Sequence, residues 1–161
     1  MAANRSEPVV AVCDAGPLIH LDELDALDLL EGFTSTLVPD AVWREVDQHR
    51  PQALHKPGMT LQRKPPTEVR VPLLASLVSA LGLDQGEQQA LQTTLECVNP
   101  VIFLTDDLAA RTAAGALNLK THGTVGLIIR GIRLGKRTHD QVLEFSKRSR
   151  LIRPCTFDQA C

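Results

Sequence analysis

The chain lacks the features that mark several common classes of protein. Only 3% of its 161 residues are aromatic and none is Tyr, which disfavours a single-strand binder that stacks bases on aromatic rings. Its four cysteines form no CxxC pair and have no His at metal-ligand spacing, which argues against structural zinc and a disulfide framework. No apolar run approaches the roughly 20 residues of a membrane span. The first eight residues lack the apolar core of a secretory signal, so we expect a cytoplasmic protein.

The overall composition is that of an ordinary globular protein. Hydrophobic residues make up 43% of the chain and charged residues 22%, which excludes wholesale disorder. The net charge is only -2, from 17 basic and 19 acidic side chains, so no global field points to nucleic acid. The length predicts a single domain over residues 1–161. Its core is expected at about 8–135, followed by a basic helix and tail over 136–161.

Short apolar runs alternate with helical patterns along the chain. The predicted strands are 8–13, 34–38, 68–71, 101–104 and 119–121. The predicted helices are 17–31, one that begins near Asp40, 73–81, 84–97, 108–117, 124–134 and 138–150. Residues 49–66 hold several prolines and little periodicity, which predicts a loop. The alternation predicts an α/β fold, a three-layer α/β/α sandwich around a mostly parallel sheet.

Acidic residues follow two of the predicted strands directly. Asp14 follows 8–13, and Asp106 and Asp107 follow Thr105 at the end of 101–104. Because ligands bind at the carboxyl ends of parallel strands, we expect these carboxylates at one edge of the sheet. Neighbouring carboxylates repel one another unless a cation lies between them. The pattern therefore predicts a metal site.

Two further acids lie near the start of predicted helices. Glu45 lies in the helix that begins near Asp40, and Glu87 opens the helix before the 101–104 strand. An all-oxygen set of Asp and Glu ligands favours Mg²⁺ or Mn²⁺ over zinc. Such an ion can activate water and stabilise the charge that develops on a phosphodiester. The residues therefore indicate metal-assisted hydrolysis of a phosphate ester.

Each acid also has a purely structural interpretation. Asp14, and one of Asp106 and Asp107, can cap the helix that follows. Glu87 can interact with a helix dipole, and Glu45 can be a surface residue. No single position decides between these interpretations and a metal site.

Four segments together resemble the PIN-domain family. They are VCDAGPLI (12–19), VPDAVWREV (38–46), LDQGEQQAL (83–91) and FLTDDLAAR (103–111), and their order and spacing match that family. The stretch AAGALNLKTHGTVG (113–126) also looks like its small-residue helix, strand and Gly-Thr-x-Gly turn. The resemblance covers about residues 8–135. It is greatest to the branch near the VapC-like ribonuclease toxins in which two Asp residues are adjacent.

This resemblance implies a Mg²⁺- or Mn²⁺-dependent endoribonuclease that acts as the toxin of a toxin–antitoxin pair. It also implies an RNA substrate, an antitoxin protein as partner and a homodimer. By position, the catalytic acids are Asp14, Glu45, Glu87 and Asp107. The implied metal ligands are Asp14, Glu87, Asp106 and Asp107, with Thr105 and Arg111 in support. Ala15 stands where many members have a hydroxyl residue.

Basic side chains are candidates for contacts with RNA or a partner. Arg44 and Arg111 lie near the acids in sequence, where each can pair with a carboxylate or contact a phosphate. Residues 130–153 hold eight bases against two acids, whereas residues 1–31 hold one base against seven acids. This asymmetry indicates either solvated helix faces or a phosphate- or partner-binding surface that includes Lys147, Arg148 and Arg150. The five scattered histidines and Trp43 are interpreted as surface or packing residues.

Functions from other classes are also compatible with an α/β sheet. A PIN fold that binds RNA or a protein without hydrolysis stays an alternative, and the Ala15–Gly16 pair favours it. A phosphatase of the HAD type needs an acid two residues after its nucleophilic Asp, and Gly16 stands there. A dinucleotide-binding domain is disfavoured because neither a GxGxxG motif nor a P-loop is present.

Overall fold

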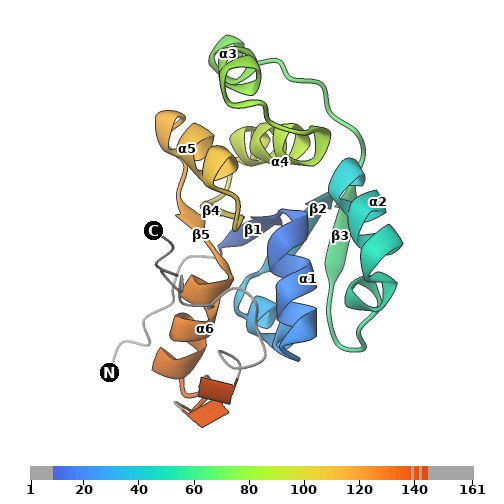
Figure 1. Ribbon diagram of the computed structural model, residues 1–161, viewed down its shortest axis with the longest axis vertical. Helices are drawn as coiled ribbons and strands as arrows, with labels where there is room; N and C mark the ends of the chain where they lie inside the picture. Colours follow the sequence, from blue (N-terminus) through green and yellow to red (C-terminus); the bar gives the residue numbers. More distant parts are fainter. Residues whose placement is uncertain (1–8, 139, 142, 145–161) are drawn as a thin grey trace, which may run out of the picture.

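Five short strands form one sheet in the order β3-β2-β1-β4-β5, and all four pairs are parallel. The computed structural model describes residues 9–138, 140, 141, 143 and 144. The strands are β1 (Val10–Cys13), β2 (Ser35–Pro39), β3 (Leu61–Lys64), β4 (Val101–Leu104) and β5 (Thr121–His122) (Figure 1). β1, all four of whose residues are buried, lies at the centre of the sheet, because a strand buried on both faces needs no polar side.

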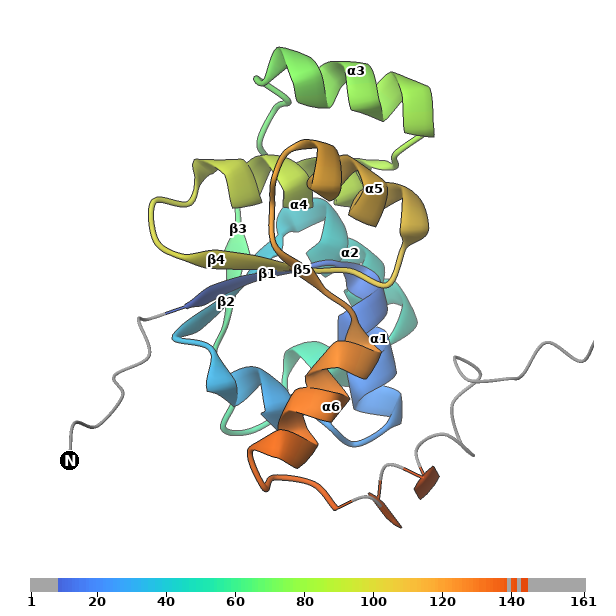
Figure 2. The ribbon, with the colours of Figure 1, turned by 90° about the vertical axis from the view of Figure 1, so that its left-hand side faces the viewer.

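Helices cover both faces of the sheet. Val10 and Val12 of β1 pack toward one face, and Ala11 and Cys13 toward the other. The first face carries α3 (Pro72–Leu81), α4 (Gln85–Glu96) and α5 (Leu108–Ala116). The second carries α1 (Ala15–Glu23), α2 (Asp40–His49), α6 (Thr124–Arg133) and the 3₁₀ helices η1 (Leu27–Gly32) and η2 (Pro51–Leu54). The predicted three-layer α/β/α sandwich is confirmed (Figure 2).

The register of the central strands aligns their carboxyl ends. Cys13 pairs with Leu104, and the Asp14 amide donates to the Leu104 carbonyl at 2.9 Å. On the other side of β4, the Thr105 amide donates to the His122 carbonyl at 3.0 Å. The residues just after β1, β4 and β5 therefore meet at one edge of the sheet.

Three sequence predictions of local structure are wrong. Residues 68–71 form no strand, and β3 lies instead inside the predicted 49–66 loop. β3 has the sequence LQRK and lies at the sheet edge, where polar side chains face solvent and no apolar pattern is needed. The helix predicted over 17–31 ends at Glu23, because Asp25 adopts a left-handed conformation with φ 50°.

Two residues of the predicted basic surface pair with acids of the segment 1–31. Arg137 binds the Asp28 carboxylate, and Lys136 lies 3.9 Å from Glu31. The Arg130 guanidinium stacks on the Phe33 ring with 5.0 Å to its centroid. These contacts attach α6 to η1. Lys147, Arg148, Arg150 and most of the predicted 138–150 helix lie outside the described residues. Within the described part, no helix has the length and apolar character needed to cross a membrane.

Candidate active site

Asp14 lies at the carboxyl end of β1 and caps α1. Its Oδ1 accepts a hydrogen bond from the Ala15 amide at 2.8 Å, and its Oδ2 accepts one from Thr105 Oγ1 at 3.0 Å. Only 7% of the residue is exposed. Both carboxylate oxygens are therefore oriented by the protein, although residue 15 has no hydroxyl.

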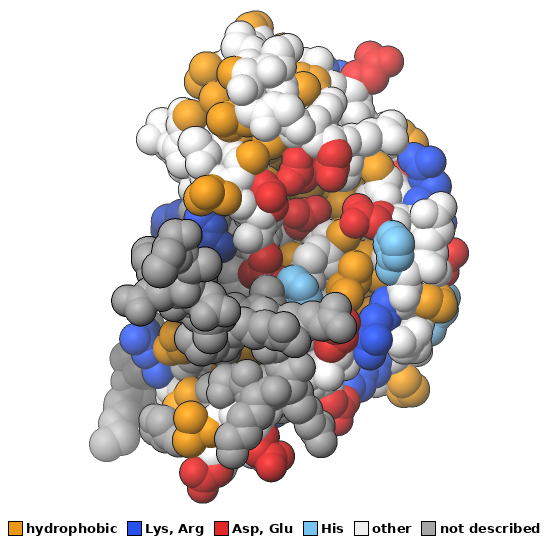
Figure 3. Space-filling model, in the orientation of Figure 1, with side chains coloured by type: hydrophobic (Ala, Val, Ile, Leu, Met, Phe, Trp, Pro, Cys, Tyr) orange, Lys and Arg blue, Asp and Glu red, His pale blue; other side chains and the backbone are white. Residues whose placement is uncertain are grey.

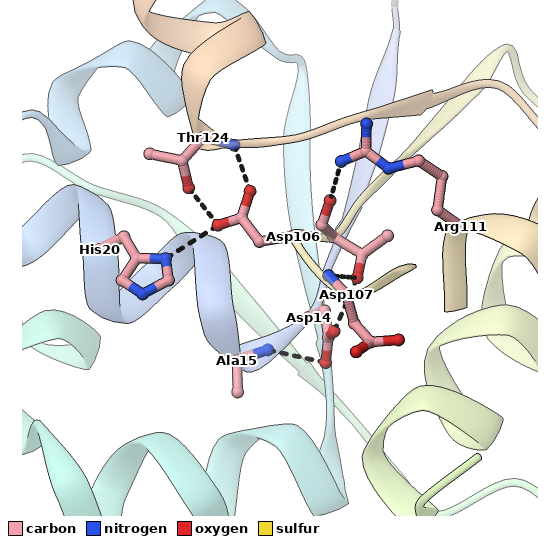
Figure 4. Close-up of polar contacts among 8 residues, drawn as sticks. Asp14, Ala15, His20, Asp106, Asp107, Arg111 and Thr124 are labelled. Atoms are coloured by element: carbon pink, nitrogen blue, oxygen red, sulfur yellow. Dashed lines mark hydrogen bonds and ion pairs between the residues drawn. The ribbon is translucent and has the colours of Figure 1, made fainter. Parts of the chain in front are cut away.

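Thr105 connects the ends of β1 and β4. Its fully buried hydroxyl donates to Asp14 and accepts from the Asp107 amide at 3.1 Å. Asp107 in turn caps α5, because its Oδ1 accepts from the Ala110 amide at 2.8 Å. Figure 4 shows the Asp14 and Asp107 side chains projecting to the same side of the β4 end. One hydroxyl thus holds the two acidic positions in a fixed relation.

The first turn of α4 contributes two more carboxylates. Asp84 Oδ1 accepts from the Glu87 amide at 2.9 Å, and Glu87 Oε2 accepts from the Asp84 amide at 2.8 Å, which is a capping box. Asp84 also lines a groove with Glu45 of α2. Sequence reasoning missed Asp84, although the Asp-x-x-Glu spacing at a helix start was a signal for this pair.

A glycine allows the two helices to approach one another. A Cβ atom on Gly86 would lie 3.3 Å from Asp84 Oδ1 and 3.3 Å from Val42 Cγ2. The same position is 3.7 Å from Glu45 Oε2. The absence of a side chain at residue 86 therefore leaves room for the Asp84 and Glu45 carboxylates beside each other.

The carboxylates raise one another's pKa. Burial, with Asp84 and Glu45 nearby, raises the pKa of Asp14 to about 6, despite its two hydrogen bonds. Burial and the charges of Asp84, Asp107 and Asp14 raise the pKa of Glu87 to about 7. The pKa of Glu45 is also raised, by burial and by Asp84. We call these five residues the acidic cluster: Asp14, Glu45, Asp84, Glu87 and Asp107.

The acidic cluster contains negative charge without a basic partner. Among the described residues, none of its members forms an ion pair with Lys, Arg or His. Figure 3 shows acidic side chains gathered in a hollow in the middle of this face of the molecule. Such an arrangement favours a bound cation, because each neighbouring carboxylate otherwise raises the cost of ionising the others.

The donor chemistry fits Mg²⁺ or Mn²⁺. Every member of the cluster offers carboxylate oxygens, which these hard cations prefer. Glu45 accepts no hydrogen bond from the described residues, and Asp84, Glu87 and Asp107 each use one oxygen for a helix cap. As the described side chains stand, no three Asp, Glu, His or Cys residues are grouped closely enough to hold an ion. Binding one ion with three of these carboxylates therefore requires side chains to move from the positions they have here, while Asp84, Glu87 and Asp107 each keep one oxygen outside a cap.

Asp106 faces different partners from its neighbour Asp107. Its Oδ1 accepts from the Thr124 amide at 2.7 Å, and its Oδ2 accepts from Thr124 Oγ1 at 2.5 Å. The same Oδ2 lies 2.9 Å from His20 Nδ1. Burial alone would raise the pKa of Asp106, but the bonds from His20 and Thr124 outweigh it and lower the pKa. Figure 4 shows this carboxylate turned toward α1 and α6.

His20 is a second residue that sequence reasoning missed. The sequence indicates only a surface or packing residue, because nothing in it relates His20 to Asp106, which is 86 positions away. Its position six residues after Asp14 places it on α1, and only the pairing of β1 with β4 brings this helix beside Asp106.

Neither candidate arginine pairs with the acidic cluster. Arg111 Nη2 donates to the Thr105 carbonyl at 3.0 Å, so it supports the end of β4 through the backbone. Arg44 Nε donates to Asp40 Oδ2 at 3.1 Å, while Arg44 lines the groove beside Glu45. Trp43 packs against the core as expected, with the Arg63 guanidinium 5.6 Å from its ring centroid.

Comparisons with known proteins identify the fold. A family model described as PIN domain matches residues 10–147. The chain belongs to the PIN-domain family. Its structure is similar to a PilT N-terminus domain protein from the hyperthermophilic archaeon Sulfolobus solfataricus, with a TM-score of 0.53 and 11% sequence identity. That similarity covers 81% of this chain and 97% of the archaeal protein. No curated protein matches the chain by sequence.

Membership confirms the resemblance found in the sequence. PIN domains have a nuclease-type fold, so this chain shares a fold on which phosphodiester hydrolysis is common. The acidic cluster lies at the carboxyl edge of the sheet, where ligands of such parallel sheets bind.

Proposed function

We propose that this PIN-domain protein is a Mg²⁺- or Mn²⁺-dependent endoribonuclease. The observation that carries the proposal is the acidic cluster. Burial and neighbouring carboxylates raise the pKa values of Asp14, Glu45 and Glu87, and no member of the cluster forms an ion pair with a described residue. A divalent cation at this position relieves the repulsion that the fold builds in.

The acids that would hold an ion come from two kinds of element. Asp14 and Asp107 are fixed by Thr105 at the ends of β1 and β4, whereas Glu45 and Glu87 belong to helices. An ion bound there supplies positive charge against the charge that grows on a phosphodiester during attack by water. The protein's own part is to orient carboxylate oxygens before substrate arrives, which lowers the cost of reaching the transition state.

The lip of the groove beside Glu45 suits a phosphodiester strand. The guanidiniums of Arg44 and Arg63 both bind the Asp40 carboxylate, with side chains 54% and 48% exposed. One carboxylate against two guanidiniums leaves a net positive charge on these three side chains, of which Arg44 lines the groove. A strand whose scissile phosphate lies at the acidic cluster can therefore place a neighbouring phosphate on these arginines.

The finer assignments rest on the family resemblance. We propose that the protein acts in the cytoplasm as the toxin of a toxin–antitoxin pair and works as a homodimer. Val125 and Ile129 lie one turn apart on α6 and are 47% and 43% exposed, which supports a protein contact there.

The test is an RNA cleavage assay with Mg²⁺ or Mn²⁺. Asp14→Asn and Asp107→Asn are each expected to lower the cleavage rate by about a thousandfold, or roughly 4 kcal/mol of transition-state stabilisation. The matched control is Asp22→Asn, because Asp22 is an acid on α1 that is paired with Arg50. Cleavage that persists in EDTA, or that survives both substitutions, contradicts the proposal.

One observation favours a second candidate, a PIN fold that binds RNA without hydrolysing it. No three described Asp, Glu, His or Cys side chains are already grouped to hold an ion. RNA binding that is lost in Arg44→Gln, together with no cleavage in any divalent ion, would select this alternative.

A further inference from the structure

The two adjacent acids Asp106 and Asp107 face opposite ways at the end of β4. We propose that Asp106 is a positioning residue and not a metal ligand: it attaches the first turn of α6 and the His20 side chain of α1 to the end of β4, and so fixes Thr105 and Asp107. The inference rests on the proposed function for its effect on catalysis, but its structural part stands alone.

The Asp106 carboxylate is already occupied by protein donors. Thr124 donates to it twice, through its amide at 2.7 Å and its hydroxyl at 2.5 Å, and His20 Nδ1 lies at 2.9 Å. Its side chain is only 18% exposed, and Thr124 is fully buried. An ion on Asp106 would displace the Thr124 amide and leave a buried donor without a partner, which is unfavourable.

The backbone around Thr124 is shaped to fit this carboxylate. A Cβ atom on Gly123 would lie 2.7 Å from Asp106 Oδ1 and 2.8 Å from Arg111 Nη2. Both separations are closer than real Cβ contacts allow, so any side chain at residue 123 would push the Asp106 carboxylate or the Arg111 guanidinium out of its present position. Gly123 and Thr124, the N-cap and first residue of α6, therefore both take part in the contact with Asp106.

The contact is transmitted to the acidic cluster through Thr105 and Asp107. The Thr105 amide and carbonyl are held by His122 and Arg111, each at 3.0 Å. Asp106 fixes the next residue from the α6 side. The Thr105 hydroxyl then joins Asp14 to the Asp107 amide. A change in the Asp106 side chain therefore shifts Asp107 without touching a substrate.

The test compares three variants for Mn²⁺ affinity by calorimetry and for RNA cleavage. In Asp106→Asn, the amide oxygen still accepts from Thr124 and the amide nitrogen can donate to Thr124 Oγ1, so we expect both quantities within about threefold of the unchanged protein. Asp107→Asn should lower Mn²⁺ affinity by about a hundredfold. Asp106→Ala should lower cleavage by about 10–100-fold, the range for residues that orient metal ligands. An Asp106→Asn protein that loses as much Mn²⁺ affinity as Asp107→Asn overturns the proposal.

A second measurement does not depend on metal or activity. Hydrogen exchange of the Thr124 amide should become at least tenfold faster in Asp106→Ala and stay unchanged in Asp106→Asn. Thr124→Val should lower cleavage and Thr124→Ser should restore it, with Thr112→Val on α5 as the control.

If the unchanged protein neither binds Mn²⁺ nor cleaves RNA, the proposed function fails, and hydrogen exchange of the Thr124 amide still decides the inference. Unchanged exchange in Asp106→Ala contradicts it, and if that variant does not fold, the comparison of Thr124→Val with Thr124→Ser decides the inference instead.

Discussion

Two acidic regions of this molecule differ in whether their carboxylates form ion pairs. On the flank formed by the end of α1 and η1, four of the five acids, all but Glu23, have a base beside them. These pairs are Asp22–Arg50, Asp25–Lys56, Asp28–Arg137 and Glu31–Lys136. In the acidic cluster no carboxylate forms an ion pair with a described residue, and the basic neighbour recorded there is His49, whose charge acts on Glu45 against the effects of burial and Asp84.

The pKa values follow this difference. Hydrogen bonding and the charge of Lys56 lower the pKa of Asp25 on the flank, whereas burial and neighbouring carboxylates raise that of Asp14 to about 6. The flank uses acids to hold η1 and η2 in place. The cluster keeps charge uncompensated, which is unfavourable for the fold alone and useful for a cation. The missing ion-pair partner, more than the acid itself, distinguishes the carboxylates that we propose to be functional.

Outside the carboxylates themselves, the largest effect is expected at the hydroxyl that joins two members of the cluster. Thr105→Val should lower metal-dependent RNA cleavage by about 10–100-fold, because Asp14 and the Asp107 amide lose their common partner. Thr105→Ser should recover most of the rate. Thr112→Val serves as the control, since that hydroxyl only bonds the Leu108 carbonyl on exposed α5. Equal rates in the Val and Ser variants of Thr105 would show that the hydroxyl does not orient the acids.

Divalent ions should stabilise the cluster but not the flank. At a hundredfold excess over its dissociation constant, Mn²⁺ is expected to add about 2.7 kcal/mol to the free energy of unfolding. The gain should be larger at pH 7.5 than at pH 5, because Asp14 and Glu87, with pKa values raised to about 6 and about 7, must lose protons to bind it. Thermal unfolding with and without Mn²⁺ measures this. A gain that survives in Asp14→Asn would place the ion elsewhere.

In EDTA, replacing an acid by its amide should raise the free energy of unfolding in the acidic cluster and lower it on the flank. The pKa of Asp14 is 3.8 for the isolated group and about 6 in the fold, so the folded state holds its proton longer and stability falls as pH rises between these values. Asp14→Asn should therefore raise the free energy of unfolding by about 1–3 kcal/mol above pH 6.5 and leave it unchanged near pH 4. Asp22→Asn breaks the pair with Arg50 and should lose up to about 1 kcal/mol. Urea unfolding at both pH values checks the two signs, and a loss in Asp14→Asn at pH 7 would refute the comparison.

The smallest effect is expected at the exposed end of the flank. Asp25 is 88% exposed on its side chain, so solvent screens its pair with Lys56. Asp25→Asn should change the free energy of unfolding by less than about 0.5 kcal/mol and leave cleavage unchanged. Urea unfolding measures this difference. A larger loss would mean that pairing on the flank matters more than exposure suggests.

The central elements could be predicted because their residues are buried. PVVAVC and VIFL are too apolar for any place but the inside of a parallel sheet, and Asp14 follows the first run directly. β3 could not be predicted, since LQRK at a sheet edge resembles loop sequence. The residues Leu24, Leu27 and Leu30 suggested one long helix, but their three-residue spacing falls on a chain reversal and a 3₁₀ helix.

The sequence by itself determined the layered α/β fold and which acids follow its strands, because apolar runs and the residues that end them are local properties. It also carried the family motifs. Only the tertiary structure decided that Asp84 joins the acidic cluster and that Asp106 turns to Thr124 and His20. It also decided that Lys136 and Arg137 pair with the acidic flank. These outcomes depend on where the helices pack, because packing decides which side chains distant along the chain come together. The charges in the sequence do not show which acids will have a base or a hydrogen-bond donor beside them.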